Sequence, residues 1–325
     1  MNKLKFLWRI EAGASFWIMR GLATALKQLG HEFFFWDSSK ISAFKAFGDI
    51  EPDIAFLQNY NLDNAQIKCC NNRPNLKVIL KSGFFGDFVR EYKDKFDTGP
   101  FCEEDHLKKT LQIKNITAVF GYGLEPEYIL GDWKSYGYKL WGFLPAADPT
   151  VYYPVQSQSE YKSDLCFVGG YWPYKSQQLD WLVKLCYPVG QYNIKILGNG
   201  IWPVVQYIGQ VSDADQLIYQ SSATICPNLS EPHATNITKG FEINERIFKL
   251  GISKCFVLSD YVQNYTKIFN NEQLILCKTF DDFKDNIDHY LKYPEKRQPY
   301  IDALYKEVLQ NHTYSNRAQE LLTLL

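Results

Sequence analysis

The chain has 325 residues, of which 46% are hydrophobic and 22% are charged, so it is long enough for two domains with ordinary cores. A formal net charge of -1 disfavours nucleic acid as a general partner. No apolar stretch approaches the ~20 residues of a membrane-spanning helix, and no signal peptide is recognised, so we expect a cytoplasmic protein without a membrane span. Eight cysteines without a C-x-x-C pair are typical of buried free thiols in a reducing compartment.

The first half of the chain alternates strand and helix patterns. Residues 4–10 predict a strand, residues 16–30 a helix with Ser15 as N-cap and Gly30 as C-cap, and residues 31–37 a second strand. Four more strands are expected at residues 52–60, 76–83, 116–123 and 138–145. This alternation favours a parallel, doubly wound sheet. Two irregular aromatic stretches, residues 83–100 and 124–138, follow strand ends, where such folds place ligands.

A break in this pattern introduces a second half. Prolines 145, 149 and 154 and the polar run after them place a domain boundary near residue 155, which gives an N-terminal domain of residues 1–155 and a C-terminal domain of residues 156–325. Strands are then expected at residues 164–170, 193–200, 204–211, 223–229, 255–261 and 273–279. Helices are expected at residues 176–186, 213–222 and 262–269, and in a tail from Asp281 to Leu325 that Pro294 interrupts. This order predicts a second Rossmann-like domain.

One helix, expected near residues 243–252, concentrates charged residues at its start. Glu242, Glu245, Arg246 and Lys249 recur at three- and four-residue spacings, so their side chains share one face. Free N–H groups and the helix dipole favour a phosphate at that end. The alternative interpretation is a solvated face with two weak ion pairs.

Glycines follow two strands of the second half. These are Gly169-Gly170, with Lys175 near the next expected helix, and Gly198-Asn199-Gly200. Such glycines let a backbone approach a ligand closely, although a plain turn is the alternative. Together with Asn244, Arg246 and Lys249 they predict a cationic site for a diphosphate. The five histidines never pair at ligand spacing, and no dinucleotide fingerprint or P-loop occurs, so we expect no metal and no resident cofactor.

Longer stretches of the chain resemble the CgeB-like, spore-maturation glycosyltransferases. The resemblance is carried by DLCFVGGYWPYKS, IGQVSDADQLIYQSSATICPNLSEP, INERIFKLGISKCFVLSDYV, HYLKYPEKR and NHTYSNRAQELL, and more loosely by the loop Ala12-Gly13-Ala14 and the segment AADPTVYYP. It implies an α/β protein of GT-B architecture, with two facing Rossmann-like domains and a C-terminal helical run that packs back on the first domain. It also implies that the nucleotide diphosphate of a sugar donor binds in the C-terminal domain.

The same resemblance implies roles for individual residues. Gly169, Gly170 and Lys175 match the turn near the donor phosphates, and Asn244 and Arg246 match the start of the charged helix. The family continues with a Phe-Glu pair whose carboxylate takes the ribose hydroxyls, whereas here Phe248 is followed by Lys249. Either Glu245 supplies the carboxylate, or Lys249 holds the donor through its phosphates, or the usual donor is lost. Glu231 is a candidate contact to the sugar, with Gly198 and Asn199 as further donor-side candidates.

We expect a metal-independent transfer in which cationic side chains stabilise the leaving diphosphate, namely Lys175, Arg246 and Lys249. For an inverting enzyme, Asp87 is the first candidate general base in the N-terminal domain, with His106 and Glu11 behind it and Gly13 on the same acceptor side. The hydroxyl acceptor stays open among glycan, protein, metabolite and modified base, and so do the choice of hexose or pentose and the oligomeric state. A sugar-nucleotide epimerase or phosphorylase and a non-catalytic sugar-nucleotide-binding module are the alternative functions.

Overall fold

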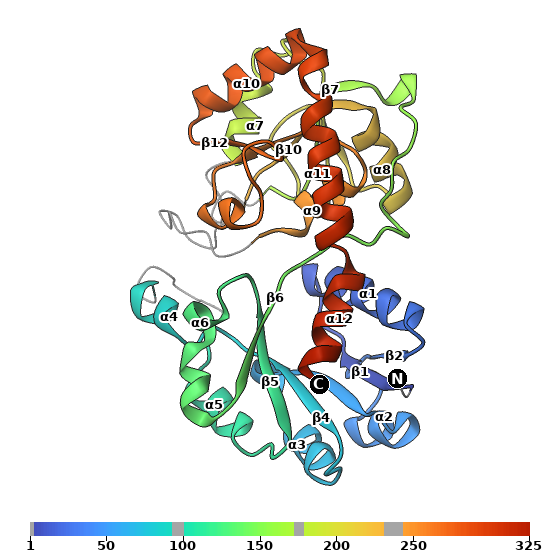
Figure 1. The fold of residues 1–325 in the computed structure, drawn as a ribbon, viewed down its shortest axis with the longest axis vertical. Helices are drawn as coiled ribbons and strands as arrows, with labels where there is room; N and C mark the ends of the chain where they lie inside the picture. Colours follow the sequence, from blue (N-terminus) through green and yellow to red (C-terminus); the bar gives the residue numbers. More distant parts are fainter. Residues whose placement is uncertain (1–2, 93–100, 172–178, 231–242) are drawn as a thin grey trace. The chain divides into compact units, whose positions relative to one another are not determined.

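The computed structural model describes residues 3–92, 101–171, 179–230 and 243–325. The chain forms two compact units, Met1–Leu144 with Tyr314–Leu325, and Pro145–Thr313. Each unit is built on a six-stranded sheet whose neighbouring strands pair in parallel (Figure 1). The expected α/β class and the twelve expected strands are thereby confirmed.

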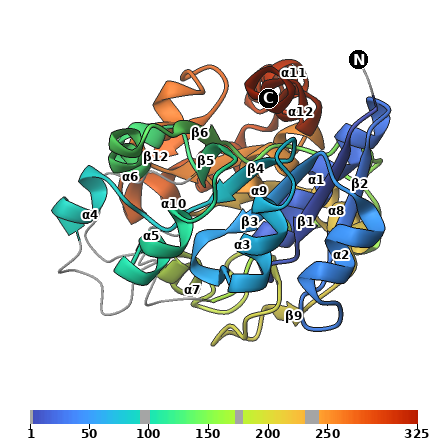
Figure 2. The ribbon, with the colours of Figure 1, turned by 90° about the horizontal axis from the view of Figure 1, so that it is seen from below.

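The sheet of the first unit has the strand order β2-β1-β3-β4-β5-β6 (Figure 2). Its strands read as continuous apolar runs because helices cover both faces, and all five residues of β3 are buried. The strands are β1 (Lys5–Arg9), β2 (Glu32–Trp36), β3 (Ile54–Gln58), β4 (Lys77–Lys81), β5 (Ile116–Tyr122) and β6 (Lys139–Phe143). The helices are α1 (Ala14–Gln28), α2 (Ala43–Ile50), α3 (Asn64–Asn71), α4 (Asp87–Tyr92), α5 (Glu104–Thr110), α6 (Pro126–Leu130) and α12 (Tyr314–Leu324), with the 3-10 turns η1 (Asn59–Asn61) and η3 (Gly131–Tyr136).

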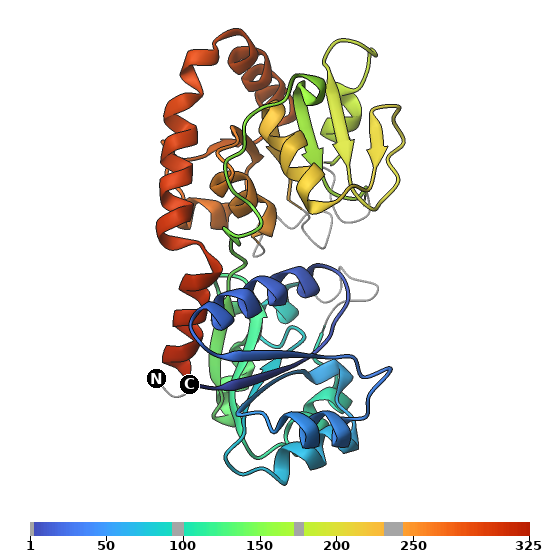
Figure 3. The same cartoon turned by 90° about the vertical axis from the view of Figure 1, so that its right-hand side faces the viewer.

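Helix α1 lies on one face of this sheet and α2 on the other (Figure 3). The expected N-cap of α1 was wrong: the helix begins after Gly13, whose φ of 75° suits a glycine, and no side chain caps it. Ser15 lies inside the first turn instead, where its hydroxyl accepts a hydrogen bond from Lys81 at 2.9 Å. Gly30 does follow the end of the helix with a φ of 91°.

The end of the chain belongs to the first unit. Helix α12 packs against α1, and a Cβ on Gly21 would lie 2.2 Å from the ring of Tyr314. Arg317 Nε also donates to the carbonyl of Leu144 at 2.9 Å. Only α12, out of the expected C-terminal run, packs back on the first unit, because α10 and α11 lie in the second.

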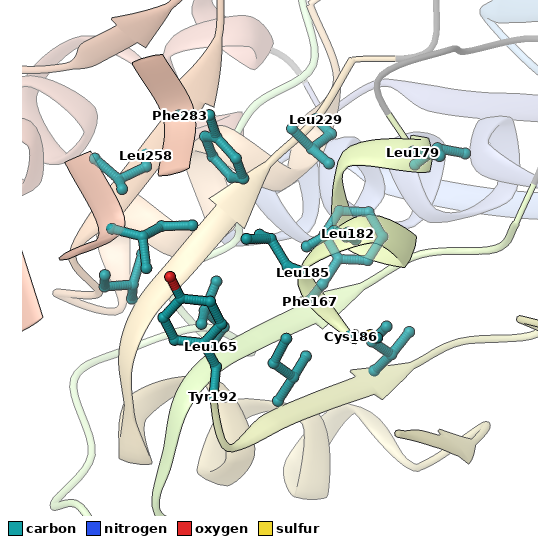
Figure 4. Packing of buried hydrophobic residues seen from close by; sticks show 14 of the residues in the cluster. Leu165, Phe167, Leu179, Leu182, Leu185, Cys186, Tyr192, Leu229, Leu258 and Phe283 are labelled. Atoms are coloured by element: carbon teal, nitrogen blue, oxygen red, sulfur yellow. The ribbon is translucent and has the colours of Figure 1, made fainter. Parts of the chain in front are cut away.

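The sheet of the second unit has the order β12-β11-β10-β7-β8-β9. Its strands are β7 (Ser163–Val168), β8 (Ile194–Leu197), β9 (Tyr207–Gly209), β10 (Ala223–Asn228), β11 (Val257–Asp260) and β12 (Ile275–Cys277). Its helices are α7 (Leu179–Leu185), α8 (Asp213–Ser222), α9 (Glu245–Ile252), α10 (Phe280–Lys292) and α11 (Gln298–Asn311), with the 3-10 turns η4 (Ser159–Tyr161), η5 (Gln263–Lys267) and η6 (Pro294–Lys296). The expected helix at residues 262–269 is thus only the 3-10 turn η5. Phe167 and Leu165 of β7 pack with Leu179, Leu182 and Leu185 of α7 in the core (Figure 4).

The segment after β6 is tied to the second unit. The N–H of Ala147 donates to the carbonyl of His312 at 2.9 Å, and the N–H of Gln158 donates to Ser222 Oγ at 3.0 Å. Tyr152 is buried and donates to Asp213 at 3.3 Å. The division therefore falls at Pro145, about ten residues before the expected position.

Each sheet has one point where the chain changes direction. From β1 the chain adds β2 on one side and β3 on the other, and from β7 it adds β8 on one side and β10 on the other. In doubly wound sheets the carboxyl ends of the strands at such a switch point leave a crevice for ligands. Ligand sites are thus expected at the carboxyl ends of β1 and β3 and of β7 and β10.

Candidate functional site

Arg246 bridges the strands at the switch point of the second sheet. Its Nε donates to the carbonyl of Val168, the last residue of β7, at 2.8 Å, and its Nη1 donates to the carbonyl of Leu229, just after β10, at 2.8 Å. The guanidinium carbon lies 4.5 Å from the centre of the Phe167 ring. The arginine is always protonated, so it fixes a positive charge at the carboxyl edge of the sheet.

Helix α9 places this arginine in its first turn. Asn244 is the N-cap with extended backbone, and its amide donates to the carbonyl of Leu229 at 3.4 Å instead of capping the helix. Ile247, Phe248 and the apolar residues after them bury the opposite face, which fixes the rotation of the helix. Asn244 and Arg246 therefore both lie at the start of one helix, as predicted.

The two glycine loops pack directly on each other beside Arg246. A Cβ on Gly169 would lie 2.8 Å from Arg246 Nη2, and a Cβ on Gly198 would lie 2.5 Å from the Gly169 carbonyl oxygen. A Cβ on Gly200 would lie 2.8 Å from the Cα of Gly170. The exposed Asn199 lies in the same loop. Glycine is required here because the backbones of the two loops touch.

Lys249 is paired within its own helix. Its Nζ lies 2.6 Å from Glu245 Oε2, and the two side chains are 17% and 14% exposed. The Nζ also lies 4.9 Å from the centre of the Tyr152 ring. Burial opposes the charge of the lysine, but Glu245 and Tyr152 raise its pKa overall. Lys249 thus stays protonated, its positive charge is balanced by Glu245, and it holds the carboxylate of Glu245 in place.

A buried polar network at the ends of β10 and β11 was not anticipated from the sequence. The N–H of Ser230 donates to Asp260 Oδ1 at 3.0 Å, and the Ser230 hydroxyl lies 3.1 Å from the same oxygen. Asn228 donates to the hydroxyls of Ser259 and Tyr265, each at 2.9 Å. Burial raises the pKa of Asp260 to about 6, while Ser230 and the charge of Arg246 act in the opposite direction. The polar end of the otherwise apolar strand VLSD was the signal that could have revealed it.

The predicted acceptor-side residues all lie in the first unit, each with its own local partners. Asp87 begins α4 with a side chain 70% exposed, and it pairs with Arg90 at 2.7 Å. His106 accepts a hydrogen bond from the N–H of Glu103 at 3.1 Å and thereby helps to cap α5. Gly13 caps α1. Glu11, two residues before Gly13, contacts Lys81 and Tyr60 at the switch point of the first sheet. Lys175, Glu231 and Glu242 lie outside the described residues.

Among the described residues, no group of three or more histidine, cysteine, aspartate or glutamate side chains is arranged to hold a metal ion. No helix within that part of the chain is long and apolar enough to cross a membrane.

Solved structures with the same architecture include a sucrose-phosphate synthase from Thermosynechococcus elongatus, with a TM-score of 0.67 at 12% identity over 99% of this chain and 98% of that one. They also include an alpha-glucosyltransferase in complex with UDP and a 13-mer DNA containing an HMU base, with a TM-score of 0.66 at 11% identity over 99% of each chain. Anabaena Alr3699/HepE in complex with UDP and glucose has a TM-score of 0.61 at 11% identity over 99% of this chain and 100% of that one. The chain has the GT-B fold.

A family model agrees with this GT-B fold. Residues 178–323, a little under half of the chain, match the model described as glycosyl transferase-like. None of the curated proteins matches the sequence. Over residues 178–323 the chain is similar to this family, and over nearly its whole length it shares the fold of the solved structures named above. In this GT-B chain, α9 and both glycine loops of the second unit are the features that place Arg246.

Proposed function

We propose that the chain is a glycosyltransferase that moves a sugar from a nucleoside diphosphate donor to a hydroxyl acceptor. The observation that carries the proposal is Arg246, which fixes a positive charge at the switch point of the second sheet beside the two glycine loops. A preorganised cation of this kind stabilises the negative charge that develops on a leaving diphosphate. The glycosyl transferase-like match over residues 178–323 supports the same activity.

Within this proposal, the donor contacts fall on the second unit. Gly169, Gly170 and Asn199 bring backbone and amide groups to the diphosphate, with Gly198 and Asn244 supporting them. Lys175 and Glu231 are further donor contacts in this proposal. We assign the carboxylate of Glu245, held by Lys249 at 2.6 Å, to the ribose hydroxyls, and Lys249 to positioning Glu245 rather than to the phosphates.

UDP is the first nucleotide to test. Several solved structures of this fold are complexes with UDP or UDP-glucose. We also propose a metal-independent and cofactor-independent reaction, a CgeB-like specificity, and a cytoplasmic location that accords with eight free cysteines. Transfer of a hexose and transfer of a pentose are both compatible with this site.

The test is calorimetric binding of UDP, GDP, CDP, ADP and dTDP to the full chain, with and without EDTA. The proposal predicts that one of them binds, that UDP binds best, and that EDTA leaves its affinity unchanged. Saturating that nucleotide at ~100 times its Kd should add ~2.7 kcal/mol to the free energy of unfolding. Binding of none of the five would contradict a donor site, and loss of binding in EDTA would contradict metal independence. Binding without cleavage of any corresponding nucleotide sugar would favour the non-catalytic module.

A further inference from the structure

A second charged cluster lies at the switch point of the first sheet. Glu11 follows β1, Tyr60 follows β3 and Lys81 is the last residue of β4. Lys81 Nζ donates to Glu11 Oε2 at 2.8 Å, and the Tyr60 hydroxyl donates to Glu11 Oε1. Donors that come from two other strands therefore hold one carboxylate across the gap between β1 and β3.

The cluster is partly buried but reachable. The side chains of Lys81 and Glu11 are 16% and 20% exposed. Lys81 Nζ also donates to Ser15 Oγ at 2.9 Å and lies 4.7 Å from the centre of the Tyr122 ring. Desolvating an ion pair to this extent costs about as much as the pair returns, so stability alone does not account for it. Its place at a switch point indicates a role in binding a ligand.

The protonation of the cluster suits a hydroxyl ligand. Burial and, after it, the charge of Glu11 raise the pKa of Tyr60, so the phenol stays a proton donor to the carboxylate. Each carboxylate oxygen accepts one of the two described hydrogen bonds and has a second lone pair for another donor. An ionised carboxylate only accepts hydrogen bonds, which favours a neutral hydroxyl compound over an anion. The centres of the Tyr60 and Tyr122 rings lie 5.8 and 4.7 Å from Lys81 Nζ, and aromatic rings of this kind suit the apolar face of a sugar.

We propose that Glu11, Lys81 and Tyr60 form the subsite for the hydroxyl of a neutral, carbohydrate-like acceptor, and that Glu11 takes its proton. This inference rests on the glycosyl transfer proposed above. The acceptor O–H bond breaks and its proton passes to the Glu11 carboxylate, while the oxygen forms a bond to the anomeric carbon of the donor sugar. The bond from that carbon to the diphosphate oxygen breaks, and the diphosphate leaves with the electron pair. Lys81 and Tyr60 are positioning residues, because they act by orienting Glu11.

Glu104 provides a matched control. It is also an acidic residue of the first unit, but its side chain is 79% exposed and pairs with Lys108 on the surface. An exposed ion pair of this kind contributes little to stability or to the ordering of a ligand. Removing Glu104 is therefore expected to leave both folding and transfer unchanged.

The experiment measures UDP release from UDP-glucose by the full chain, with water alone and with glycerol as a simple hydroxyl acceptor. Glu11→Ala should release UDP ~100-fold more slowly than wild type, as expected for loss of a general base, and added formate should restore part of the rate. Its UDP affinity, measured by calorimetry, should match that of wild type. Glu104→Ala should release UDP at the wild-type rate.

The outcomes separate this inference from the proposed function. A wild-type protein that binds no nucleotide would contradict both the proposed function and the role of Glu11. Wild type that binds UDP but cleaves UDP-glucose with neither acceptor would contradict both as well, in favour of the non-catalytic module. A Glu11→Ala variant that matches wild type would overturn the role of Glu11 alone. A slow variant that formate does not restore would overturn proton transfer in favour of a structural role. If Glu11→Ala does not fold, Glu11→Gln replaces it, since the amide oxygen still accepts from Tyr60, and wild-type release by that variant would equally overturn the inference.

Discussion

At the scale of single residues, the second unit relies on polar side chains whose partners come from distant parts of the sequence. Arg246 contacts the carbonyls of Val168 and Leu229, and Asp260 accepts from Ser230. The two side chains are also coupled, because the charge of Arg246 opposes the rise in the pKa of Asp260 that burial causes. The charge of the candidate donor site therefore depends on both.

Asp260 gives a prediction for the pH dependence of stability. Its pKa is about 6 in the folded protein and near 3.8 when unfolded, so between these values the folded state holds a proton that the unfolded state releases. The contribution of this carboxyl is thus fully present below pH ~4 and lost as the pH rises through ~6, by roughly 3 kcal/mol. Asp260→Asn keeps an oxygen acceptor and should lack this loss. Urea denaturation of both proteins from pH 4 to 7.5 measures it, and a constant difference between them would contradict the raised pKa.

At the scale of elements, the loops after β7 and β8 depend on glycine for their contact. Gly198 has a φ of 143° and its missing Cβ leaves room for the carbonyl of Gly169. Gly190 also has a positive φ, 92°, but a Cβ there would meet nothing within 4 Å. A Cβ at Gly190 would therefore meet backbone strain alone, whereas a Cβ at Gly198 would meet both strain and a steric clash.

Replacing each glycine by alanine tests this difference. Gly190→Ala should lower the free energy of unfolding by about 1–2 kcal/mol, the usual strain of a non-glycine residue at positive φ. Gly198→Ala should cost at least about 2 kcal/mol more, because its Cβ would lie 2.5 Å from the Gly169 oxygen. Chemical denaturation compares the two variants under one set of conditions. Equal losses would show that the loops separate without cost.

The sequence predicted elements better than contacts. The strands were found because burial on both faces leaves continuous apolar runs such as IAFLQ in β3. Arg246 and Asn244 were found because a helix start leaves a recognisable pattern. Two ion pairs were not singled out from the sequence. The pair of Lys249 with Glu245 competes with another pair at four-residue spacing on the same helix, and the pair of Lys81 with Glu11 joins residues 70 positions apart. Ser15 was mistaken for a cap because its partner, Lys81, lies 66 residues away at the end of β4.

At the scale of the whole molecule, two units of the same sheet type each place charged side chains at a switch point. In the second unit this is Arg246 between β7 and β10, and in the first it is Glu11 between β1 and β3. The proposed division of labour gives the donor diphosphate to the second unit and the acceptor hydroxyl to the first. The central claim is therefore that Arg246 binds the diphosphate.

The most direct measurement is the UDP affinity of Arg246→Lys beside that of Arg297→Lys. Arg297 is a matched control, since it donates to the carbonyl of Thr224 at 3.4 Å, near the amino end of β10 and away from the proposed site. Calorimetry should show a loss of about 10-fold to 100-fold in UDP affinity for Arg246→Lys, the usual effect of losing hydrogen bonds between charged groups, and wild-type affinity for Arg297→Lys. Thermal unfolding of both variants checks that they fold. Wild-type UDP affinity in a folded Arg246→Lys variant would contradict a diphosphate site at this switch point.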